Sequence, residues 1–245
     1  MARQPKLILR ESAIDDVVAA WQPGSFLETG AGTGYMTRKF LERGYHGACY
    51  ELSQTAREGI RRNLASYPER IQVLDSLQEL GTTTFDYLLT FEVLEHIEDD
   101  RAALQQWAQY LRPGGKILLS VPAHQRKFGP SDTVVGHLRR YERQQLRRLL
   151  ESTGFTDIQM INYGFPITEM TRKLGDRIVR NEAASNEESA AERSQRSSYS
   201  RGSTARKLIR ASGEAPFLPF KSLQRSFYSR DWGDGIIAHA TLAGR

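Results

Sequence analysis

Three glycines at alternate positions, Gly30, Gly32 and Gly34, form the part of the sequence best suited to binding chemistry. An apolar run over residues 26–29 leads into them, and residues 35–43 continue with the pattern of a helix. Glycine allows positive φ and lets a ligand lie against the backbone, and a helix start offers unpaired N–H groups and partial positive charge. The sequence therefore predicts that a small polar ligand binds at this turn.

Acidic residues stand at the ends of several predicted strands. After the first strand, further strands are expected over residues 47–51, 71–75 and 85–91. In a parallel sheet the carboxyl ends of the strands share one edge, where ligands of open α/β sheets bind. The side chains expected to converge there are those of Glu28, Glu51, Asp75 and Glu92, the last directly after Phe91.

Strand and helix patterns alternate along most of the chain. Helices are predicted over residues 11–21, 35–42, 54–66, 93–97, 101–111 and 142–152, and later strands over 116–121, 158–161 and 236–243. A turn at residues 113–115 and a loop over 122–138 complete the pattern. Nearly continuous apolar strands that alternate with helices predict an α/β fold, with a mostly parallel sheet covered by helices on both faces.

The composition is that of a soluble protein, with 39% hydrophobic and 26% charged residues among 245. No apolar run is long enough to cross a bilayer, and charge interrupts the N-terminus too early for a signal peptide, so we expect a cytoplasmic protein. Cys49 is the single cysteine and is expected in the core. One cysteine and five scattered histidines make no metal-ligand pattern, so no metal is predicted.

About seventy residues separate the sixth predicted strand from the last one, far more than an ordinary connection. We therefore predict a core of residues 1–164 and 233–245, and a basic, partly flexible insertion over 165–232. The insertion opens with a possible helix from residue 168 to 180, followed by a polar stretch over 181–204. Residues 193–230 hold nine basic residues and one acidic residue, a net charge of +8, interleaved with aromatic residues.

The spacing of the glycines separates two classes of ligand. A dinucleotide-binding turn needs G-x-G-x-x-G, but here Tyr35 follows the third glycine directly. Residues 28–34, Glu-Thr-Gly-Ala-Gly-Thr-Gly, resemble the E/D-x-G-x-G-x-G motif of class I S-adenosylmethionine-dependent methyltransferases. Residues 93–97, Val-Leu-Glu-His-Ile, and 111–115, Leu-Arg-Pro-Gly-Gly, are also similar to that family's segments. The resemblance covers roughly residues 20–160 and the last strand.

This resemblance implies a Rossmann-like seven-stranded sheet with S-adenosyl-L-methionine as cofactor. Glu51 falls where the family places the acid that holds the ribose hydroxyls, and Asp75 matches the acid that contacts adenine. Carboxylates suit both roles because they accept charge-assisted hydrogen bonds. The full set of residues expected to bind the cofactor is Glu28, Thr29, Gly30, Gly32, Gly34, Glu51, Leu52, Asp75, Ser76, Leu77, Phe91 and Glu92.

Methyl transfer to a hydroxyl or an amine also needs a base that removes a proton. His96 and His137 are the candidate catalytic residues, although a histidine at position 96 also suits a structural role. The stretch over residues 136–141, Gly-His-Leu-Arg-Arg-Tyr, is similar to a segment in one branch of the family. The side chains expected to contact the acceptor are Tyr35, His124, Arg139 and Tyr141.

The expected activity is methylation of an oxygen or nitrogen atom on a small or medium-sized metabolite. A second interpretation gives the same enzyme an RNA acceptor, held by the basic and aromatic residues of 193–230. A third places that segment on an anionic membrane, with a lipid-linked acceptor and a peripheral membrane location. A fourth is a partner subunit that binds the cofactor without catalysis. The sequence does not indicate an oligomeric state.

Overall fold

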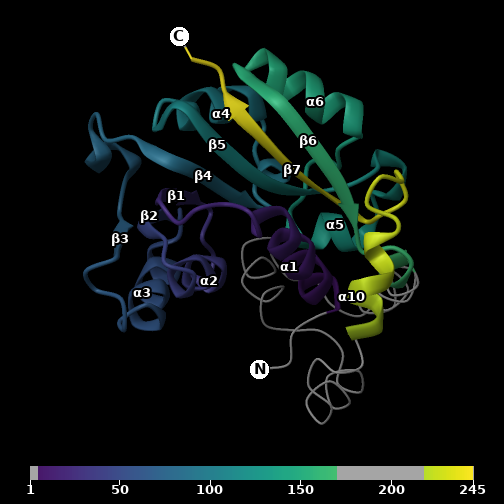
Figure 1. Cartoon of the computed structure of the whole chain (residues 1–245), viewed down its shortest axis with the longest axis horizontal. Coiled ribbons are helices and arrows are strands. Elements are labelled where there is room, and N and C mark those ends of the chain that lie inside the picture. The colour runs from purple at the N-terminus through teal and green to yellow at the C-terminus, as the bar shows by residue number, and fades with distance from the viewer. Residues whose placement is uncertain (1–4, 170–217, 245) are drawn as a thin grey trace. The chain divides into compact units, whose positions relative to one another are not determined.

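A seven-stranded sheet organises the protein, with strand order β3-β2-β1-β4-β5-β7-β6 (Figure 1). The computed structural model describes residues 5–169 and 218–244. Its strands are β1 (Ser25–Thr29), β2 (His46–Tyr50), β3 (Ile71–Leu74), β4 (Phe85–Phe91), β5 (Leu111–Pro122), β6 (Phe155–Tyr163) and β7 (Gly235–Leu242). Its helices are α1 (Pro5–Val18), α2 (Tyr35–Glu42), α3 (Gln54–Asn63), α4 (Asp100–Ala108), α5 (Pro130–Val135), α6 (Arg143–Ser152) and α10 (Leu218–Arg225). Three short 3₁₀ turns are η1 (Leu77–Leu80), η2 (Leu94–His96) and η3 (Gln125–Lys127).

Strand direction confirms the mostly parallel sheet. Strand β1 pairs in parallel with β2 and β4, and the pairs β2–β3 and β4–β5 are also parallel. Strands β6 and β7 instead run in opposite directions. The amide of Ala243 donates to the carbonyl of Gly154, whereas the amide of Asp234 donates to the carbonyl of Tyr163, each at 3.0 Å. The sheet therefore ends in an antiparallel hairpin, whose two strands are joined by the long insertion.

The chain divides into two compact units. The glycine-turn unit comprises residues 20–121, 144–159 and 238–245, and the α10 unit comprises residues 1–19, 122–143 and 160–237. The predicted division into a core and an insertion over 165–232 groups the residues differently and stays a prediction. Most of that insertion, including the polar stretch over 181–204, lies outside the described residues. Only residues 168 and 169 of its expected first helix are described, and they are helical.

Apolar burial explains the elements of the glycine-turn unit. Its central strands are almost wholly buried, with Phe26, Leu27 and Leu88 at 1% exposure or less. Helices α2 and α3 lie on the opposite side of these strands from α4 and α6 (Figure 1), so both faces of the sheet are covered. Cys49 is fully buried in β2, and this burial raises the pKa of its thiol to about 12. The prediction of an unreactive core cysteine agrees with that environment.

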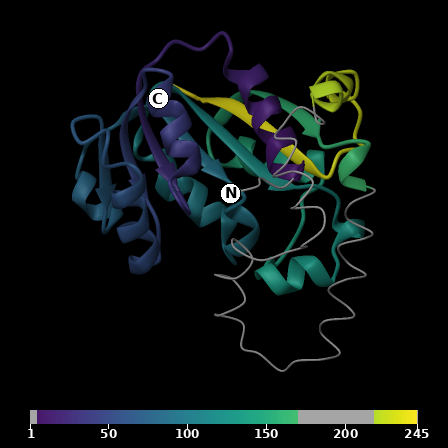
Figure 2. The same ribbon diagram turned by 90° about the horizontal axis from the view of Figure 1, so that it is seen from below.

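Helices α1 and α10, at opposite ends of the sequence, lie side by side in the α10 unit (Figure 2). The buried amide of Gln224 donates to the carbonyl of Leu9 at 3.0 Å. The guanidinium of Arg225 pairs with Asp16 at 2.7 Å, and the hydroxyl of Tyr228 donates to the same carboxylate at 2.8 Å. Polar contacts of α10 with α1 therefore fix the end of the insertion to the start of the chain.

Several side chains of the predicted basic, aromatic segment make contacts within the protein. Arg225 and Tyr228 are held by α1, and Phe227 packs against Phe165 and Trp232 with ring centroids 4.9 and 5.9 Å away. These groups give no support to stacking on bases or insertion into a membrane. Residues 193–217 of the same segment lie outside the described residues. None of the described helices is both long and apolar enough to cross a membrane.

Several boundaries predicted from the sequence were wrong. Helix α1 begins at Pro5 and ends at Val18, not at 11 and 21, and α3 ends at Asn63. The expected turn at 113–115 lies within β5 as a bulge, because Phe85 pairs with Leu111 whereas Tyr87 pairs with Lys116. The bulge lets the extra residues loop out while the strand continues.

The expected loop over 122–138 contains η3 and the short helix α5. Pro130 occupies the first position of α5, where its missing N–H costs nothing. The carboxylate of Asp132 caps the helix by accepting from the amide of Gly129 at 2.9 Å. These capping signals were present in the sequence, but the helix is too short to show an apolar period. Strand β6 is also longer than predicted, at both ends.

Candidate functional site

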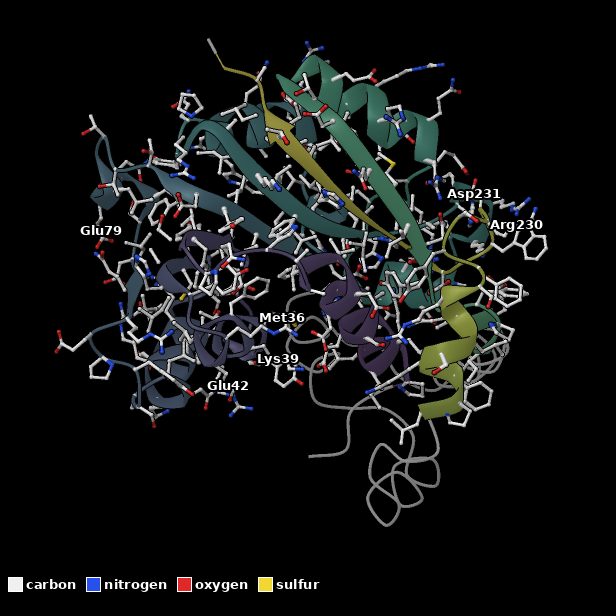
Figure 3. The ribbon with its side chains drawn as sticks, in the orientation of Figure 1. Met36, Lys39, Glu42, Glu79, Arg230 and Asp231 are labelled. Atoms are coloured by element: carbon white, nitrogen blue, oxygen red, sulfur yellow. The ribbon has the colours of Figure 1, made fainter. Side chains whose placement is uncertain are left out.

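The glycine turn joins β1 to α2 with all three glycines in the positive-φ region. The φ angles of Gly30, Gly32 and Gly34 are 72°, 57° and 73°. The amide of Gly30 donates to the carbonyl of Tyr50 at 2.9 Å, so the turn is anchored to the end of β2. Helix α2 begins directly after Gly34, and Figure 3 labels Met36, Lys39 and Glu42 on it. The turn thus lies next to a helix N-terminus, as the sequence predicted, and binding of a ligand there stays a prediction.

Glu51 closes over this turn from the end of β2. Its Oε2 accepts a hydrogen bond from the amide of Gly32 at 2.9 Å, and its Oε1 accepts from the amide of Ser53 at 3.3 Å. A carboxylate has about four lone-pair positions, so further donors can bind it. The structure therefore brings together the two features that the sequence could only place separately.

Glu28 has a different environment, because it is buried at 2% exposure. Its Oε2 accepts from the hydroxyl of Thr37 on α2 at 2.5 Å. This contact fixes the helix to the strand on either side of the glycines. Neighbouring Thr29 is also buried. An ordering role for Glu28 is therefore supported by geometry, and direct contact with a ligand stays a prediction.

Asp75 lies at the end of β3 and is paired with two arginines of α3. Arg57 Nε and Arg61 donate to its Oδ1 at 3.0 and 2.8 Å. The hydrogen bond from Arg61, followed by that from Arg57, holds the pKa of Asp75 below its ordinary value. Its side chain is 64% exposed, so solvent screens these pairs. Sequence reasoning missed both arginines, although their spacing of four residues on a helix before β3 was a usable signal.

Arg57 also fixes the end of β2. Its guanidinium donates to the carbonyls of Glu51 and Leu52, each at 2.7 Å. The side chain of Leu52 is left exposed at 81% beside the acidic residue. Ser76 caps η1 in a reciprocal arrangement with Glu79. Arg57 thus ties together the ends of two strands that carry predicted cofactor residues.

The remaining predicted cofactor residues lie at the end of β4 and on η1. Phe91 is buried and stacks on Phe40 with ring centroids 6.4 Å apart. Glu92 has a φ of 57°, and its carboxylate accepts from the hydroxyl of Ser120 at 3.1 Å. Leu77 is buried in η1. Phe91 and Leu77 therefore present little side-chain surface to a ligand, whereas the strained backbone of Glu92 marks the strand end.

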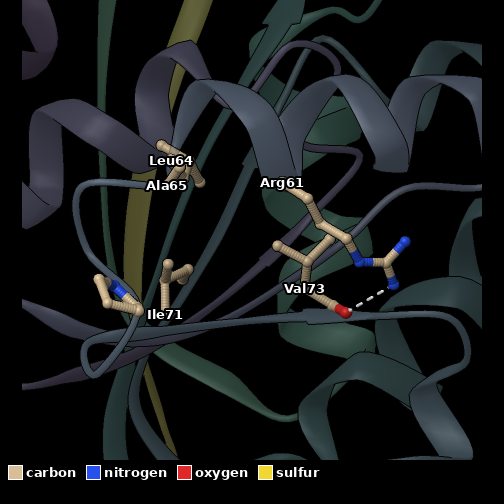
Figure 4. Close-up of a pocket in the computed structure, with 6 residues that line it drawn as sticks. Arg61, Leu64, Ala65, Ile71 and Val73 are labelled. Carbon is tan, nitrogen blue, oxygen red and sulfur yellow. Dashed lines mark hydrogen bonds between the residues drawn. The ribbon is translucent and has the colours of Figure 1, made fainter.

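The pocket in Figure 4 lies elsewhere, between α3 and the edge strand β3. Arg61 closes one side of it by donating to the carbonyl of Val73 at 3.2 Å. The remaining lining residues are mostly apolar: Leu64, Ala65, Pro68, Ile71 and Val73. This pocket includes none of the predicted site residues and suits neither a sugar nor a charged amino acid.

The predicted catalytic and acceptor residues are divided between the two units. His96 is exposed at the end of η2 in the glycine-turn unit, together with Tyr35, over whose ring Arg38 lies at 5.9 Å. The others, His124, His137, Arg139 and Tyr141, belong to the α10 unit. Tyr141 is completely buried, so its side chain offers no surface to an acceptor in this conformation. Arg139 is half-buried.

A buried ion network holds His137 in the α10 unit. His137 Nδ1 lies 2.8 Å from Asp132, and Arg140 Nε donates to both oxygens of the same carboxylate at 2.9 and 3.0 Å. Arg140 also pairs with Asp234 at 3.1 Å. Although burial alone would raise the pKa of Asp132, the hydrogen bond from His137 and the charge of Arg140 hold it below its ordinary value. Asp132 is therefore ionised and orients the imidazole.

The family described as methyltransferase domain matches residues 6–160, more than half of the chain. This chain is a class I S-adenosylmethionine-dependent methyltransferase domain. The glycine turn and the strand ends described above lie within the matched residues of the methyltransferase domain. S-adenosyl-L-methionine is accordingly the cofactor of its family, and the resemblance read from residues 28–34 is confirmed.

Curated relatives of the methyltransferase domain are also named as methyltransferases. A probable S-adenosylmethionine-dependent methyltransferase of Mycolicibacterium smegmatis is 29% identical over 168 residues, which are 62% of this chain and 61% of that protein. A ubiquinone biosynthesis O-methyltransferase of Idiomarina loihiensis is 28% identical over 98 residues, 38% of this chain and 40% of that protein. The chain therefore spans about three-fifths or less of the length of these relatives.

Solved structures confirm the fold. A putative methyltransferase from Bacillus halodurans C-125 superposes with a TM-score of 0.60 at 13% identity, covering 96% of this chain and 99% of that one. A phosphoethanolamine N-methyltransferase 2 of Haemonchus contortus, in complex with S-adenosyl-L-methionine, gives a TM-score of 0.58 at 18% identity and covers 96% of this chain and 53% of that one. The Rossmann-like sheet of the methyltransferase domain is thus shared with these proteins.

Replacing Gly30 by alanine should damage the turn more than replacing Gly32. An added Cβ at Gly30 would lie 2.3 Å from Cγ2 of Val93, whereas at Gly32 it would meet nothing within 4 Å. Both positions have positive φ and share a backbone cost of about 1–2 kcal/mol. Overpacking should add about 1–3 kcal/mol for Gly30→Ala. Urea unfolding of the two variants measures the difference, and Val93→Ala should restore part of it. Equal losses would contradict the steric argument.

Proposed function

We propose that the chain transfers a methyl group from S-adenosyl-L-methionine to an oxygen or nitrogen atom of a small or medium-sized metabolite. The observation that carries this proposal is the contact between Glu51 and the amide of Gly32, which sets a carboxylate directly over the glycine turn. The name of the ubiquinone O-methyltransferase relative supports an organic acceptor of this size. The assignment of each site residue below is part of the proposal.

Glu51 is positioned to accept hydrogen bonds from the two ribose hydroxyls of the cofactor. Its carboxylate is fixed by two backbone amides, and charge-assisted hydrogen bonds to a fixed acceptor lose little entropy. Exposed Leu52 offers an apolar surface to the adenine ring. Asp75 can accept from the adenine amine with its second oxygen, because Arg57 and Arg61 both bind Oδ1. The glycine turn takes the methionine end.

When bound, the cofactor supplies a methyl group on a positively charged sulfur that an acceptor displaces in line. Such a displacement needs alignment and exclusion of water more than it needs covalent help from the protein. A hydroxyl or ammonium acceptor must also lose a proton. His137 suits this task, because the hydrogen bond from its Nδ1 to ionised Asp132 places the basic lone pair of the neutral ring at Nε2. His96 is the alternative base.

A metabolite extract incubated with the protein and a labelled methyl donor tests this function. We expect one or a few labelled small molecules, identified by mass spectrometry, and loss of labelling in Glu51→Ala. His137→Asn should lower the rate by about 10²–10⁴-fold while cofactor binding is kept, because only the base is removed. His96→Asn is the matched variant for the alternative base.

Each competing interpretation has its own outcome in this assay. Label found in RNA would show that the acceptor is RNA, and label found in the lipid fraction would show that the acceptor is a lipid. Either result would contradict a metabolite as acceptor. Cofactor binding without transfer to any of these fractions would contradict an enzyme and favour a non-catalytic subunit. Arg225, Phe227 and Tyr228 give no support to RNA or to a membrane, because their side chains are engaged in contacts within the protein.

A further inference from the structure

A histidine and two carboxylates from distant parts of the sequence meet in the α10 unit. His124 follows β5, Glu142 precedes α6, and Asp231 lies between α10 and β7, where Figure 3 labels it beside Arg230. One ligand atom from each of the three residues lies within 4.8 Å of the others. The positions 124, 142 and 231 are too far apart to form a sequence motif, so the absence of a metal pattern in the sequence has no bearing on this cluster.

The two ring nitrogens of His124 face different carboxylates. Nδ1 lies 3.3 Å from Oε2 of Glu142, within hydrogen-bond distance, and Oε1 of Glu142 accepts from the amide of Gln125 at 3.0 Å. Nε2 points to Asp231, with 3.7 Å between Nε2 and Oδ1. A separation of 3.7 Å is too long for a hydrogen bond. Nε2 is buried without a hydrogen-bond partner among the described residues, and the side chain of His124 is only 3% exposed.

The hydrogen bond to Glu142 determines what Nε2 can do. When Nδ1 carries the proton that Glu142 accepts, the neutral ring has a lone pair at Nε2. This lone pair faces a carboxylate oxygen, so two acceptors oppose each other with no donor between them. Lys127 does not neutralise the cluster, because its ammonium donates to the carbonyls of Trp232 and Gly233 and pairs with Glu169. A cation between Nε2 and Oδ1 would satisfy both atoms.

The distance fits a metal ion. Zinc binds imidazole nitrogen and carboxylate oxygen at about 2.0–2.2 Å, so two such ligands at a tetrahedral angle are about 3.4 Å apart. The observed 3.7 Å lies close to that value and well beyond a hydrogen bond. Glu142 then takes the place of the carboxylate that orients a metal-bound histidine through its other nitrogen. Asp231 is fixed as well, because Asn162 donates to its Oδ1 at 3.1 Å.

We propose that His124 and Asp231 bind a divalent cation of the zinc type, with Glu142 as the residue that positions the imidazole. The side chains of Glu142 and Asp231 are 47% and 48% exposed, so the ion can enter from solvent. Two protein ligands leave coordination positions for water or for an oxygen atom of a bound molecule. The ion would link the segment after β5 to the segment before β7 within the α10 unit.

Titration of the chelator-treated full chain with Zn²⁺ by calorimetry, and with Co²⁺ by visible absorption, tests this site without any turnover. We expect one equivalent of metal and a Co²⁺ spectrum with nitrogen and oxygen ligation. His124→Asn should weaken binding at least about tenfold, because asparagine tolerates the φ of 65° at this position but lacks Nε2. Asp231→Asn should do the same while its Oδ1 still accepts from Asn162. Glu142→Gln should weaken binding about 10–100-fold, because a neutral amide oxygen is a weaker acceptor for the Nδ1 proton than the carboxylate.

Two controls separate loss of the site from other effects. His46→Asn removes an exposed histidine in β2 and should leave binding unchanged. Urea unfolding followed by circular dichroism reports that each variant is folded, because the substituted residues lie in the α10 unit. The proposal is overturned if the wild-type chain binds no stoichiometric metal, or if His124→Asn and Asp231→Asn bind it as well as the wild type. NMR of the imidazole ring gives a further test. The proposal is also overturned if added metal leaves the ring signals of His124 unchanged while those signals show a proton at Nε2, because that proton would then join Nε2 to Asp231.

Discussion

Glu51→Ala should lower the affinity for S-adenosyl-L-methionine by about 100-fold. The carboxylate lies over the glycine turn, where it is fixed by the amides of Gly32 and Ser53. Two hydrogen bonds from ribose hydroxyls to an ionised acceptor contribute about 1.5–3 kcal/mol each. The lower end of that range for two bonds, about 3 kcal/mol, corresponds to a change in Kd of somewhat more than 100-fold. Isothermal titration calorimetry of the two proteins with the cofactor measures this change.

A matched acid on the same unit provides the control. Glu42 ends α2, is half-exposed and pairs with Arg38 at 3.5 Å on the helix surface. Glu42→Ala removes a carboxylate of the same type without touching the turn, so the affinity should stay within twofold of wild type. Circular dichroism of both variants verifies the fold. Undiminished cofactor binding by Glu51→Ala would contradict the proposal that Glu51 binds the ribose hydroxyls.

Arg140→Ala should destabilise the protein by about 3–5 kcal/mol, because it leaves two buried carboxylates without their common partner. Arg140 contacts Asp132 through Nε and Asp234 through Nη1, and the side chains of all three residues are at most 6% exposed. The charges of Asp234 and Asp132 overcome burial and raise the pKa of Arg140 above its ordinary value, so the cation is present at every ordinary pH. Urea unfolding followed by circular dichroism gives the change in free energy of unfolding.

Two further variants test whether charge or lost packing causes that effect. Asp132→Asn in the Arg140→Ala background should recover part of the stability, because a neutral amide replaces a buried carboxylate that has lost its guanidinium partner. Arg38→Ala removes an arginine from an exposed pair with Glu42 and should cost less than about 1 kcal/mol. A loss for Arg140→Ala no larger than that for Arg38→Ala would show that the buried network contributes little to stability.

Much of the glycine-turn unit could be predicted from the sequence because its signals are local. The apolar run of β1, the spacing of Gly30, Gly32 and Gly34, and the start of α2 at Tyr35 all lie within twenty residues and were predicted correctly. Strand β4 was predicted with its observed bounds, because the ends of its mostly apolar run mark where the strand begins and ends. The errors at α1 and β6 concern ends, where packing decides how far an element continues.

The sequence by itself determined the order of strands and helices, the glycine turn and the acids at the carboxyl ends of β1, β2 and β3. These depend on periodicity and on glycine conformation, which act over a few residues. Only the tertiary structure decided which groups those acids contact. It placed Glu51 on Gly32, two arginines of α3 on Asp75, and His124 between Glu142 and Asp231. Such contacts join residues up to about a hundred positions apart. They cannot be predicted from local patterns, because they depend on where the side chains lie in the folded protein.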